Sequence, residues 1–290
     1  MIEVYKLGLK YYDILKSDKN SGLFEYEIIK KEFRGILCKS SVLIILNGKC
    51  DEEESKQLLN KMQKYDKKIF VMTDSIALET CKQIINKCDL VLHQRFDGNY
   101  EEIKAKQIYS GVPELFYKYL CGYPTRNYQD KQECVNFGGN NLRRQDKFDA
   151  YNLSDEIYKT RIKSYTEGYD ARISHDEYIA ELADSKYSLM ICREEYRNIN
   201  WVTARFYESI AVGCLPLVDI DYCNGLEDIF GKENIIRVSN IEDVKNVMQS
   251  MTKERFFEII NKLKFNCHKR KNKFVLQILK ELEEKQWKPI

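Results

Sequence analysis

The decisive stretch of this chain is Thr203-Ala204-Arg205-Phe206-Tyr207-Glu208-Ser209-Ile210-Ala211-Val212-Gly213-Cys214-Leu215-Pro216-Leu217-Val218. Apolar Phe206, Ile210 and Ala211 recur at helical spacing, and Gly213 is a natural residue to end a helix. The short apolar run that follows suits a buried parallel strand. The stretch therefore predicts a helix that leads into a central strand.

Two charged side chains lie on this predicted helix. Arg205 and Glu208 are three residues apart, so they are neighbours on the helix surface near its first turns. The positive end of a helix favours an anion, a guanidinium suits phosphate oxygens, and a carboxylate can accept both hydroxyls of a ribose. The pair thus fits the two ends of a nucleoside diphosphate. A surface ion pair on an ordinary amphipathic helix explains the spacing equally well.

The pattern Arg-x-x-Glu-x-x-x-x-Gly-x-x-Pro before an apolar strand resembles the C-terminal donor-binding domain of GT-B glycosyltransferases. The exostosin-like and bacteriophage DNA-glucosyltransferase branches are among the similar proteins. The segment 184–192 also looks like the strand that precedes this helix in the family. The resemblance covers roughly the C-terminal half, and it implies an α/β chain of two Rossmann-like domains with a nucleotide-sugar cleft between them. It gives Glu208 the role of ribose ligand.

Composition sets broad limits on function. The 290 residues suffice for two α/β domains, and 47 basic against 45 acidic residues leave a formal net charge of only +2. A nucleic-acid surface would therefore be local, at the basic run 268–273 or at Arg143-Arg144. The run 268–273 also reads as a solvated helix face. No apolar segment is long enough to span a bilayer, and the N-terminus lacks a secretory pattern, so we expect a cytoplasmic protein with no membrane partner. We also expect a monomer.

Ten cysteines are scattered singly, and the three histidines show no ligand spacing with them. We therefore expect reduced thiols and no metal centre. The exception to consider is Asp219-Ile220-Asp221, which spells the Asp-x-Asp manganese motif of the other glycosyltransferase fold. In that fold the motif does not follow an Arg-x-x-Glu helix, so carboxylates at a strand end without a metal are the better interpretation.

Strand and helix signals alternate along the first half of the chain. This alternation predicts a doubly wound parallel sheet. The expected strands are 1–7, 41–48, 68–74 and 88–93, and the expected helices are 25–33, 51–65 and 77–86.

A turn-rich stretch at 122–127 interrupts the alternation, and we place the domain boundary there, giving an acceptor-side domain 1–124 and a nucleotide-sugar domain 125–290. The second half resumes the alternation and ends in long helices. Its expected strands are 133–137, 161–165, 187–191, 215–218 and 234–238, and its expected helices are 146–151, 174–183, 203–211 and a series from 241 to about 284.

A second candidate site begins where the strand 133–137 runs into Gly138-Gly139 and then Arg143-Arg144. Glycines let backbone amides approach a diphosphate, and guanidinium groups neutralise it. The arrangement resembles the first strand and turn of the donor domain in phage DNA-glucosyltransferases, which places the grip on the diphosphate on Arg143 or Arg144. A surface turn with two exposed arginines is the plainer alternative. A nicotinamide dinucleotide site is disfavoured because the third glycine of Gly-x-Gly-x-x-Gly is missing.

A catalytic base is expected at the carboxyl ends of strands in the first domain, where Asp74, His93 and Asp97 lie. Each is equally readable as an ordinary loop residue. Retaining enzymes with a Glu-x₇-Glu motif would have their first glutamate at the position of Asn200, so that subgroup is disfavoured, while the stereochemistry stays open.

These patterns together predict a glycosyltransferase that moves a hexose from a UDP-sugar, with UDP-glucose favoured and no metal strictly required, to a hydroxyl acceptor. The phage-like motifs favour 5-hydroxymethylpyrimidine in double-stranded DNA as the acceptor. Two alternatives remain: an enzyme acting on a cell-surface glycan or protein, and a non-catalytic module that binds a nucleotide sugar or nucleic acid.

Overall fold

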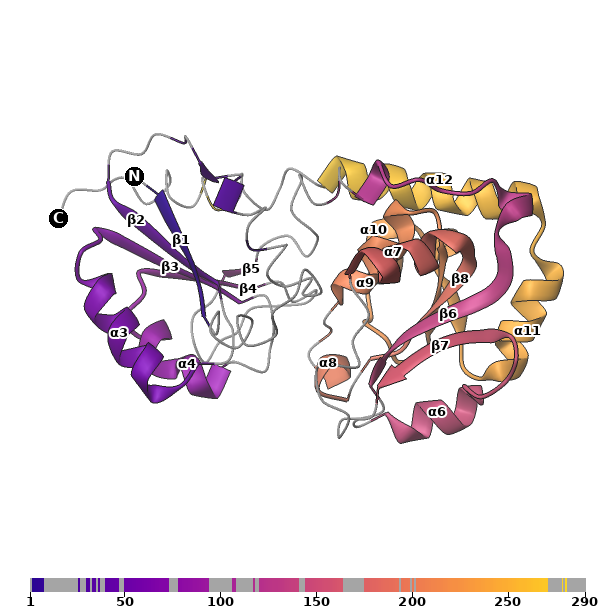
Figure 1. Ribbon diagram of the computed structural model, residues 1–290, viewed down its shortest axis with the longest axis horizontal. Coiled ribbons are helices and arrows are strands. Elements are labelled where there is room, and N and C mark those ends of the chain that lie inside the picture. Colours follow the sequence, from indigo (N-terminus) through magenta and orange to yellow (C-terminus); the bar gives the residue numbers. More distant parts are fainter. Residues whose placement is uncertain are drawn as a thin grey trace. The chain divides into compact units, whose positions relative to one another are not determined.

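The structure is a computed structural model of the chain. It describes residues 2–7, 26, 30–31, 33–34, 36, 40–46, 50–72, 78–93, 106–107, 117, 120–140, 144–163, 175–192, 194–198, 200, 202–270, 278 and 280. Two compact units make up the chain: unit 1 contains Met1–Leu115 with Asn272–Ile290, and unit 2 contains Phe116–Lys271 (Figure 1). The first unit thus ends nine residues before the boundary placed after residue 124 from the sequence. Residues 272–290, which the sequence assigned to the second domain, belong to unit 1.

Unit 1 is built on a parallel sheet. The strands are β1 (Ile2–Lys6), β2 (Val42–Leu46), β3 (Lys67–Met72), β4 (Leu90–His93) and β5 (Lys106–Gln107), and they lie side by side in chain order. Every described pairing is parallel. Helix α3 (Glu52–Met62) connects β2 to β3, and α4 (Leu78–Ile85) connects β3 to β4. The side chain of Asp51 caps α3 by accepting the amide of Glu54 at 2.9 Å.

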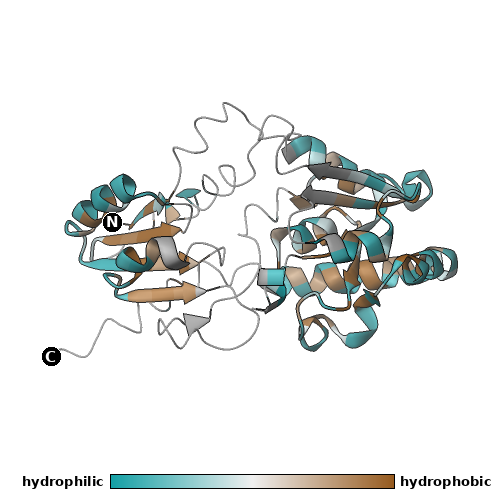
Figure 2. Ribbon diagram, turned by 90° about the horizontal axis from the view of Figure 1, so that it is seen from below, coloured by the Kyte–Doolittle hydropathy of each residue, from teal (hydrophilic) through white to brown (hydrophobic). Residues whose placement is uncertain are grey.

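Strand β2 (Val-Leu-Ile-Ile-Leu) is apolar along its whole length because both faces of the sheet are covered there, and Figure 2 shows the central strands of unit 1 in brown. All five residues of β2 are buried. Val42, Ile44 and Leu46 belong to one core cluster, while Leu43 and Ile45 belong to a second one that includes residues of α3 and α4. Ile278, from the C-terminal part of the chain, lies in the first cluster and is fully buried.

Unit 2 has a second parallel sheet, of order β10-β9-β8-β6-β7. The strands are β6 (Gln132–Asn140), β7 (Tyr158–Lys163), β8 (Ser185–Met190), β9 (Leu215–Asp219) and β10 (Ile236–Val238). The helices are α6 (Gln145–Tyr151), α7 (His175–Asp184), α8 (Glu194–Asn198), α9 (Ala204–Ala211), α10 (Leu226–Phe230), α11 (Ile241–Ser250) and α12 (Lys253–Arg270), with short 3₁₀ helices η3 (Tyr128–Asp130) and η5 (Lys232–Asn234). Figure 1 shows α6 on one side of the sheet and α7, α9 and α10 on the other. The α/β class and the two parallel sheets expected from the sequence are confirmed.

The order of the strands creates a switch point in unit 2. From β6 the chain moves to β7 on one side, and it then returns past β6 to β8 on the other side. Connections between parallel strands are right-handed, so the helices after β6 and after β7 cover opposite faces. In open α/β sheets, ligands bind outside the carboxyl ends of the two strands that flank such a point. In unit 2 these strands are β6 and β8.

The opening stretch folds as the sequence predicts. Helix α9 buries Phe206, Ile210 and Ala211, and β9 is buried along its whole length. Gly213 has φ +73°, the left-handed conformation in which many helices end. Its amide donates a hydrogen bond to the carbonyl of Ile210 at 3.1 Å.

One local expectation is wrong. Gly138 and Gly139 do not form a turn, because β6 continues through them to Asn140 and pairs in parallel with β7, with Gly138 opposite Arg161 and Gly139 opposite Ile162. The register with β7 overrides the breaking tendency of the two glycines. Helices α8 and α10, each only five residues long, were not expected from the sequence. Within the ranges that the structure covers, no helix combines the length and hydrophobicity needed to cross a bilayer.

Candidate functional site

The sequence-predicted donor residues of unit 2 gather at the carboxyl edge of its sheet. Gly138 and Gly139 lie near the end of β6, Arg144 directly precedes α6, and Arg205 and Glu208 lie in the first turns of α9. Because glycine has no side chain, the backbone of β6 can approach a ligand closely at the switch point. The sixth candidate, Arg143, lies outside the described residues.

Arg205 connects α9 to β6. Its guanidinium carbon lies 5.7 Å from the centroid of the buried Phe137 ring, within the range of a cation–π contact. Phe137 directly precedes Gly138, so the charge of Arg205 is held beside the carboxyl end of β6. This is the contact that brings the two sequence-predicted halves of the donor site together.

Glu208 is a buried carboxylate, with only 6% of its surface exposed. It lies near the hydroxyl of Tyr178 on α7, which packs against α9. Burial raises the pKa of the Tyr178 hydroxyl, the positive charge of Arg205 lowers it, and the negative charge of Glu208 raises it further. Arg205, Glu208 and Tyr178 therefore form one electrostatically coupled group, and Glu208 is not a solvated half of a surface ion pair.

The N-terminus of α9 is fixed to the loop after β9. The hydroxyl of the buried Tyr222 accepts a hydrogen bond from the amide of Thr203, which precedes the helix, at 2.9 Å. The hydroxyl of Ser209 donates to the carbonyl of Arg205 at 2.9 Å inside the helix. These bonds fix the turn that carries Arg205. The turn is therefore held both from β6, through Phe137, and from the loop after β9, through Tyr222.

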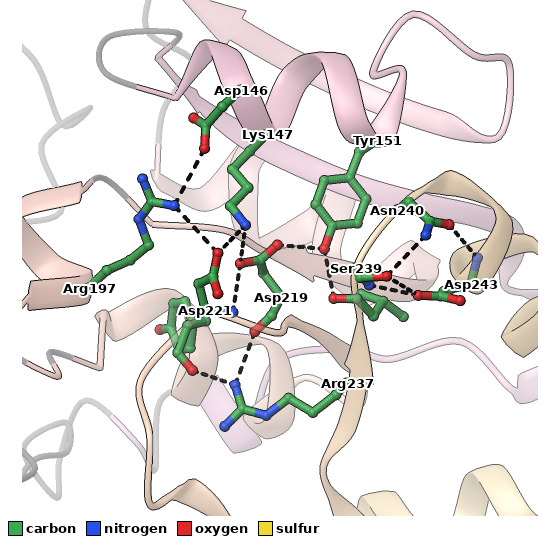
Figure 3. Close-up of polar contacts among 12 residues, drawn as sticks. Asp146, Lys147, Tyr151, Arg197, Asp219, Asp221, Arg237, Ser239, Asn240 and Asp243 are labelled. Carbon is green, nitrogen blue, oxygen red and sulfur yellow. Dashed lines mark hydrogen bonds and ion pairs between the residues drawn. The ribbon is translucent and has the colours of Figure 1, made fainter.

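A polar network that the sequence did not predict lies at the end of β9 (Figure 3). Asp219 is 1% exposed, and its carboxylate accepts hydrogen bonds from the Tyr151 hydroxyl at 2.6 Å and from the amide of Asp221 at 3.0 Å. The ammonium of Lys147 lies 3.0 Å from Asp219 and 2.6 Å from Asp221. Both Lys147 and Tyr151 come from α6, where they are one helical turn apart.

The position of Lys147 gives a physical account of the Asp-x-Asp sequence. Its ammonium lies between the carboxylates of Asp219 and Asp221, where a shared divalent cation would have to bind. A hydrogen bond from Lys147 lowers the pKa of Asp221, against the smaller opposing effect of burial. Across the described ranges, no group of three or more His, Cys, Asp or Glu side chains has the arrangement of a metal site.

Arg237 holds the same region from the side of β10. Its guanidinium donates to Glu227 at 2.7 and 3.1 Å, to the carbonyl of Asp219 at 3.0 Å and to the carbonyl of Cys223 at 2.9 Å. A further bond goes to the carbonyl of Tyr222. Arg237 of β10 thus connects the loop after β9 to α10. The same loop contains Tyr222, which bonds the residue before α9.

Arg197 of α8 approaches the network from the β8 side. Its Nη1 lies 3.4 Å from Asp146, in the first turn of α6, and 3.6 Å from Asp221. Burial raises the pKa of the Cys192 thiol to about 12, while the charges of Arg144 and Arg197 lower it. Cys192 follows β8 by two residues, so both positive charges reach the carboxyl end of that strand.

The catalytic-base candidates belong to unit 1. His93 is the last residue of β4, at the carboxyl edge of that sheet, and its backbone partner is Met72 of β3. Asp74 and Asp97 lie outside the described residues. Their roles stay predictions.

The residues that sequence reasoning missed are Lys147, Tyr151, Tyr178 and Arg197. Lys147 and Tyr151 share a helical face with spacing four, and a basic residue there is the complement of the Asp-x-Asp carboxylates. Arg197 stands in a charged stretch without periodicity, which offers no local signal.

Comparisons with known proteins identify the fold. No protein-family model matches the chain, and neither does any curated protein. Among solved structures, T4 phage β-glucosyltransferase is similar with a TM-score of 0.60 at 13% identity over 99% of each chain. An α1,3-fucosyltransferase has a TM-score of 0.56 at 12% identity over 98% of this chain and 90% of that one. The trehalose-6-phosphate synthase OtsA has a TM-score of 0.54 at 8% identity, over 93% of this chain and 77% of that one. All three are GT-B glycosyltransferases, so the GT-B fold expected from the sequence is confirmed.

Proposed function

We propose that this chain is a glycosyltransferase that binds a UDP-sugar in unit 2 and transfers the hexose to a hydroxyl group. The observation that carries the proposal is the pairing of Arg205 and the buried Glu208 at the first turns of α9, with Arg205 held against β6 beside the switch point. The proposal is supported by the general rule that ligands of open parallel α/β sheets bind at such a switch point.

Each donor residue has a chemical role in this proposal. The carboxylate of Glu208 accepts hydrogen bonds from the two ribose hydroxyls, and its burial makes those bonds strong. The guanidinium groups of Arg205, Arg144 and Arg143 neutralise the diphosphate. Because Gly138 and Gly139 have no side chains, the backbone there leaves room for the phosphate oxygens.

The same groups assist the chemical step. When the acceptor oxygen forms its bond to the anomeric carbon, the bond from that carbon to the diphosphate oxygen breaks and negative charge develops on the leaving UDP. Fixed positive groups stabilise this charge in the transition state more than in the bound donor, and so accelerate the reaction. The proton of the acceptor hydroxyl passes to a base of unit 1, for which Asp97, His93 and Asp74 are the candidates.

For the finer assignment we propose UDP-glucose as the donor and 5-hydroxymethylpyrimidine in double-stranded DNA as the acceptor. The supporting observation is that the similarity to the T4 phage enzyme extends over 99% of both chains. That phage protein is a DNA-modifying enzyme with uridine diphosphoglucose as its substrate. A target base in duplex DNA has to leave the helix to reach a buried donor, and phosphate contacts make such binding salt-dependent.

Donor binding is tested by calorimetric titration with UDP-glucose. Glu208→Ala should weaken binding at least roughly 30-fold, because even one hydrogen bond to a charged group is worth about 2 kcal/mol. Glu254→Ala is the matched control, since Glu254 is an exposed carboxylate in the first turn of α12. An unchanged affinity in Glu208→Ala refutes the ribose assignment.

Acceptor choice is tested by incubation with UDP-glucose and either hydroxymethylated DNA, unmodified DNA or a panel of glycans. We expect UDP release together with a mass gain of one hexose on hydroxymethylated DNA alone. A mass gain on a glycan but not on DNA would overturn the DNA acceptor and keep the transferase. Donor binding without transfer to any acceptor would favour a non-catalytic binding module.

A further inference from the structure

Arg197 occupies a position between the elements that form the donor site. It comes from α8, in the connection from β8 to α9, and it contacts Asp146 of α6 and Asp221 after β9 (Figure 3). Strand β8 lies between β6 and β9 in the sheet. The guanidinium of Arg197 therefore lies at the carboxyl end of β8, between a residue that follows β6 and a residue that follows β9. Strand β8 is one of the two strands that flank the switch point.

The contacts of Arg197 are those of a group that can change partners. Its distances to the two carboxylates are 3.4 and 3.6 Å, whereas strong charge-assisted bonds are about 2.7 to 2.9 Å long. The side chains of Asp146 and Asp221 are 60% and 53% exposed, so water can solvate both when the arginine leaves. Asp221 also keeps Lys147 at 2.6 Å. Releasing Arg197 therefore leaves no carboxylate buried and unpaired.

The charges around the switch point favour an anion. Arg205 lies beside β6, while Arg144 and Arg197 both act on the Cys192 thiol at the end of β8. Arg197 is 19% exposed, so it is reachable by a ligand but largely protected from water, which strengthens its pairing with phosphate oxygens.

We propose that Arg197 is an additional ligand of the donor diphosphate, and that it exchanges Asp146 and Asp221 for phosphate oxygens when the nucleotide binds. This inference rests on the proposed function, since it concerns the same donor. In this proposal the short helix α8 takes part in nucleotide recognition. The affinity for UDP then depends on Arg197, which lies outside the Arg-x-x-Glu pattern.

The test compares uridine, UMP and UDP in calorimetric titrations of the full chain and the Arg197→Met variant. Methionine keeps the length and removes the charge. We expect UDP to bind at least tenfold more weakly to the variant, UMP to be affected less, and uridine to bind within twofold of the parent chain. Arg255→Met is the matched control, because Arg255 also pairs with a carboxylate of unit 2, Glu258 at 2.8 Å on α12.

A second variant separates ligand binding from structural support. Asp146→Asn removes one resting partner of Arg197, so UDP should bind more tightly, and this gain should shrink in the double variant with Arg197→Met. Equal losses for uridine and UDP, accompanied by a lower melting temperature, would show that Arg197 only supports the fold and would overturn the inference. Unchanged UDP binding in Arg197→Met overturns it as well, while the proposed function stands if the parent chain binds UDP. A parent chain that binds no UDP overturns both.

Discussion

Replacement of Lys147 by methionine offers a quantitative test of the network at the end of β9. The substitution removes an ammonium that lies 3.0 Å from the carboxylate of Asp219, which is 1% exposed. Removing one partner of a buried ion pair typically costs 3 to 5 kcal/mol, because the remaining charge is left in a poorly solvated position. Two donors remain for Asp219, the Tyr151 hydroxyl and the Asp221 amide, so we expect the lower end of that range, about 3 kcal/mol.

The other carboxylate contributes little to this loss. Asp221 is 53% exposed and regains water when Lys147 is removed. For a domain of the size of unit 2, a loss of about 3 kcal/mol corresponds to a fall of roughly 6 to 12 °C in melting temperature. Lys245→Met is the matched control, since Lys245 pairs with Asp155 at 3.0 Å on the surface, and it should change stability far less.

A double-mutant cycle identifies the interaction responsible. Urea unfolding followed by far-ultraviolet circular dichroism gives the free energy of unfolding for the parent chain, Lys147→Met, Asp219→Asn and the double variant. When Asp219 is already neutral, Lys147→Met should cost only about 1 kcal/mol, so the coupling is about 2 kcal/mol. Equal costs of Lys147→Met in both backgrounds would refute the argument that the buried charge of Asp219 sets the size of the effect.

Three further predictions follow from the same unit. Chelation with EDTA should leave the affinity for UDP within twofold, because a lysine already lies between the carboxylates of Asp219 and Asp221 at the end of β9. Calorimetry with and without the chelator measures this affinity, and a large loss contradicts the prediction. A hydrogen bond from Arg237 lowers the pKa of Glu227, so this pair stabilises the fold above the unfolded pKa of glutamate and its contribution is lost as pH falls through the lowered value. Stability of Arg237→Met should therefore fall less steeply than that of the parent chain from roughly pH 5 to 3, as measured by urea unfolding. Burial raises the pKa of the Cys192 and Cys214 thiols, so at neutral pH iodoacetamide should label the exposed Cys121 well before either of them, as followed by peptide mass spectrometry.

The elements that the sequence predicts well are those whose signal is local. The apolar run of β2 and the spacing of Phe206, Ile210 and Ala211 in α9 report burial directly, because the same residues must face a core wherever the element packs. Gly213 marks the end of α9 for an equally local reason, its positive φ. The class of fold follows from the alternation of such segments.

The parts that escaped prediction depend on how strands are ordered. Gly138 and Gly139 read as a turn in isolation, and only the pairing with β7 shows that they extend β6. Lys147 meets Asp219 because β9 lies two strands away from β6 in the sheet, on the same side of it as β8. No pattern within a short window of sequence specifies these neighbours.

The proposed donor site shows the same division. Arg205 and Glu208 were predicted as a pair because they share one helix, and the burial of Glu208 removes the alternative of a solvated surface pair. Arg197 stands in a helix of five residues, too short for periodicity to reveal which side it presents. Its contacts emerge only when α6, α8 and the end of β9 are brought together.

The discontinuity of unit 1 has a consequence for the order in which the nascent chain folds. Unit 2 is an insertion within unit 1, and all of its residues leave the ribosome before Ile278 does. Ile278 is fully buried in one cluster with Val4 and Val42, residues that precede unit 2 in the chain. Burial of such a side chain is worth about 1.5 to 3 kcal/mol, a substantial share of the stability of a small domain. During translation, unit 2 can thus reach its native state while the core of unit 1 is still incomplete, because the segment that carries Ile278 is synthesised after unit 2.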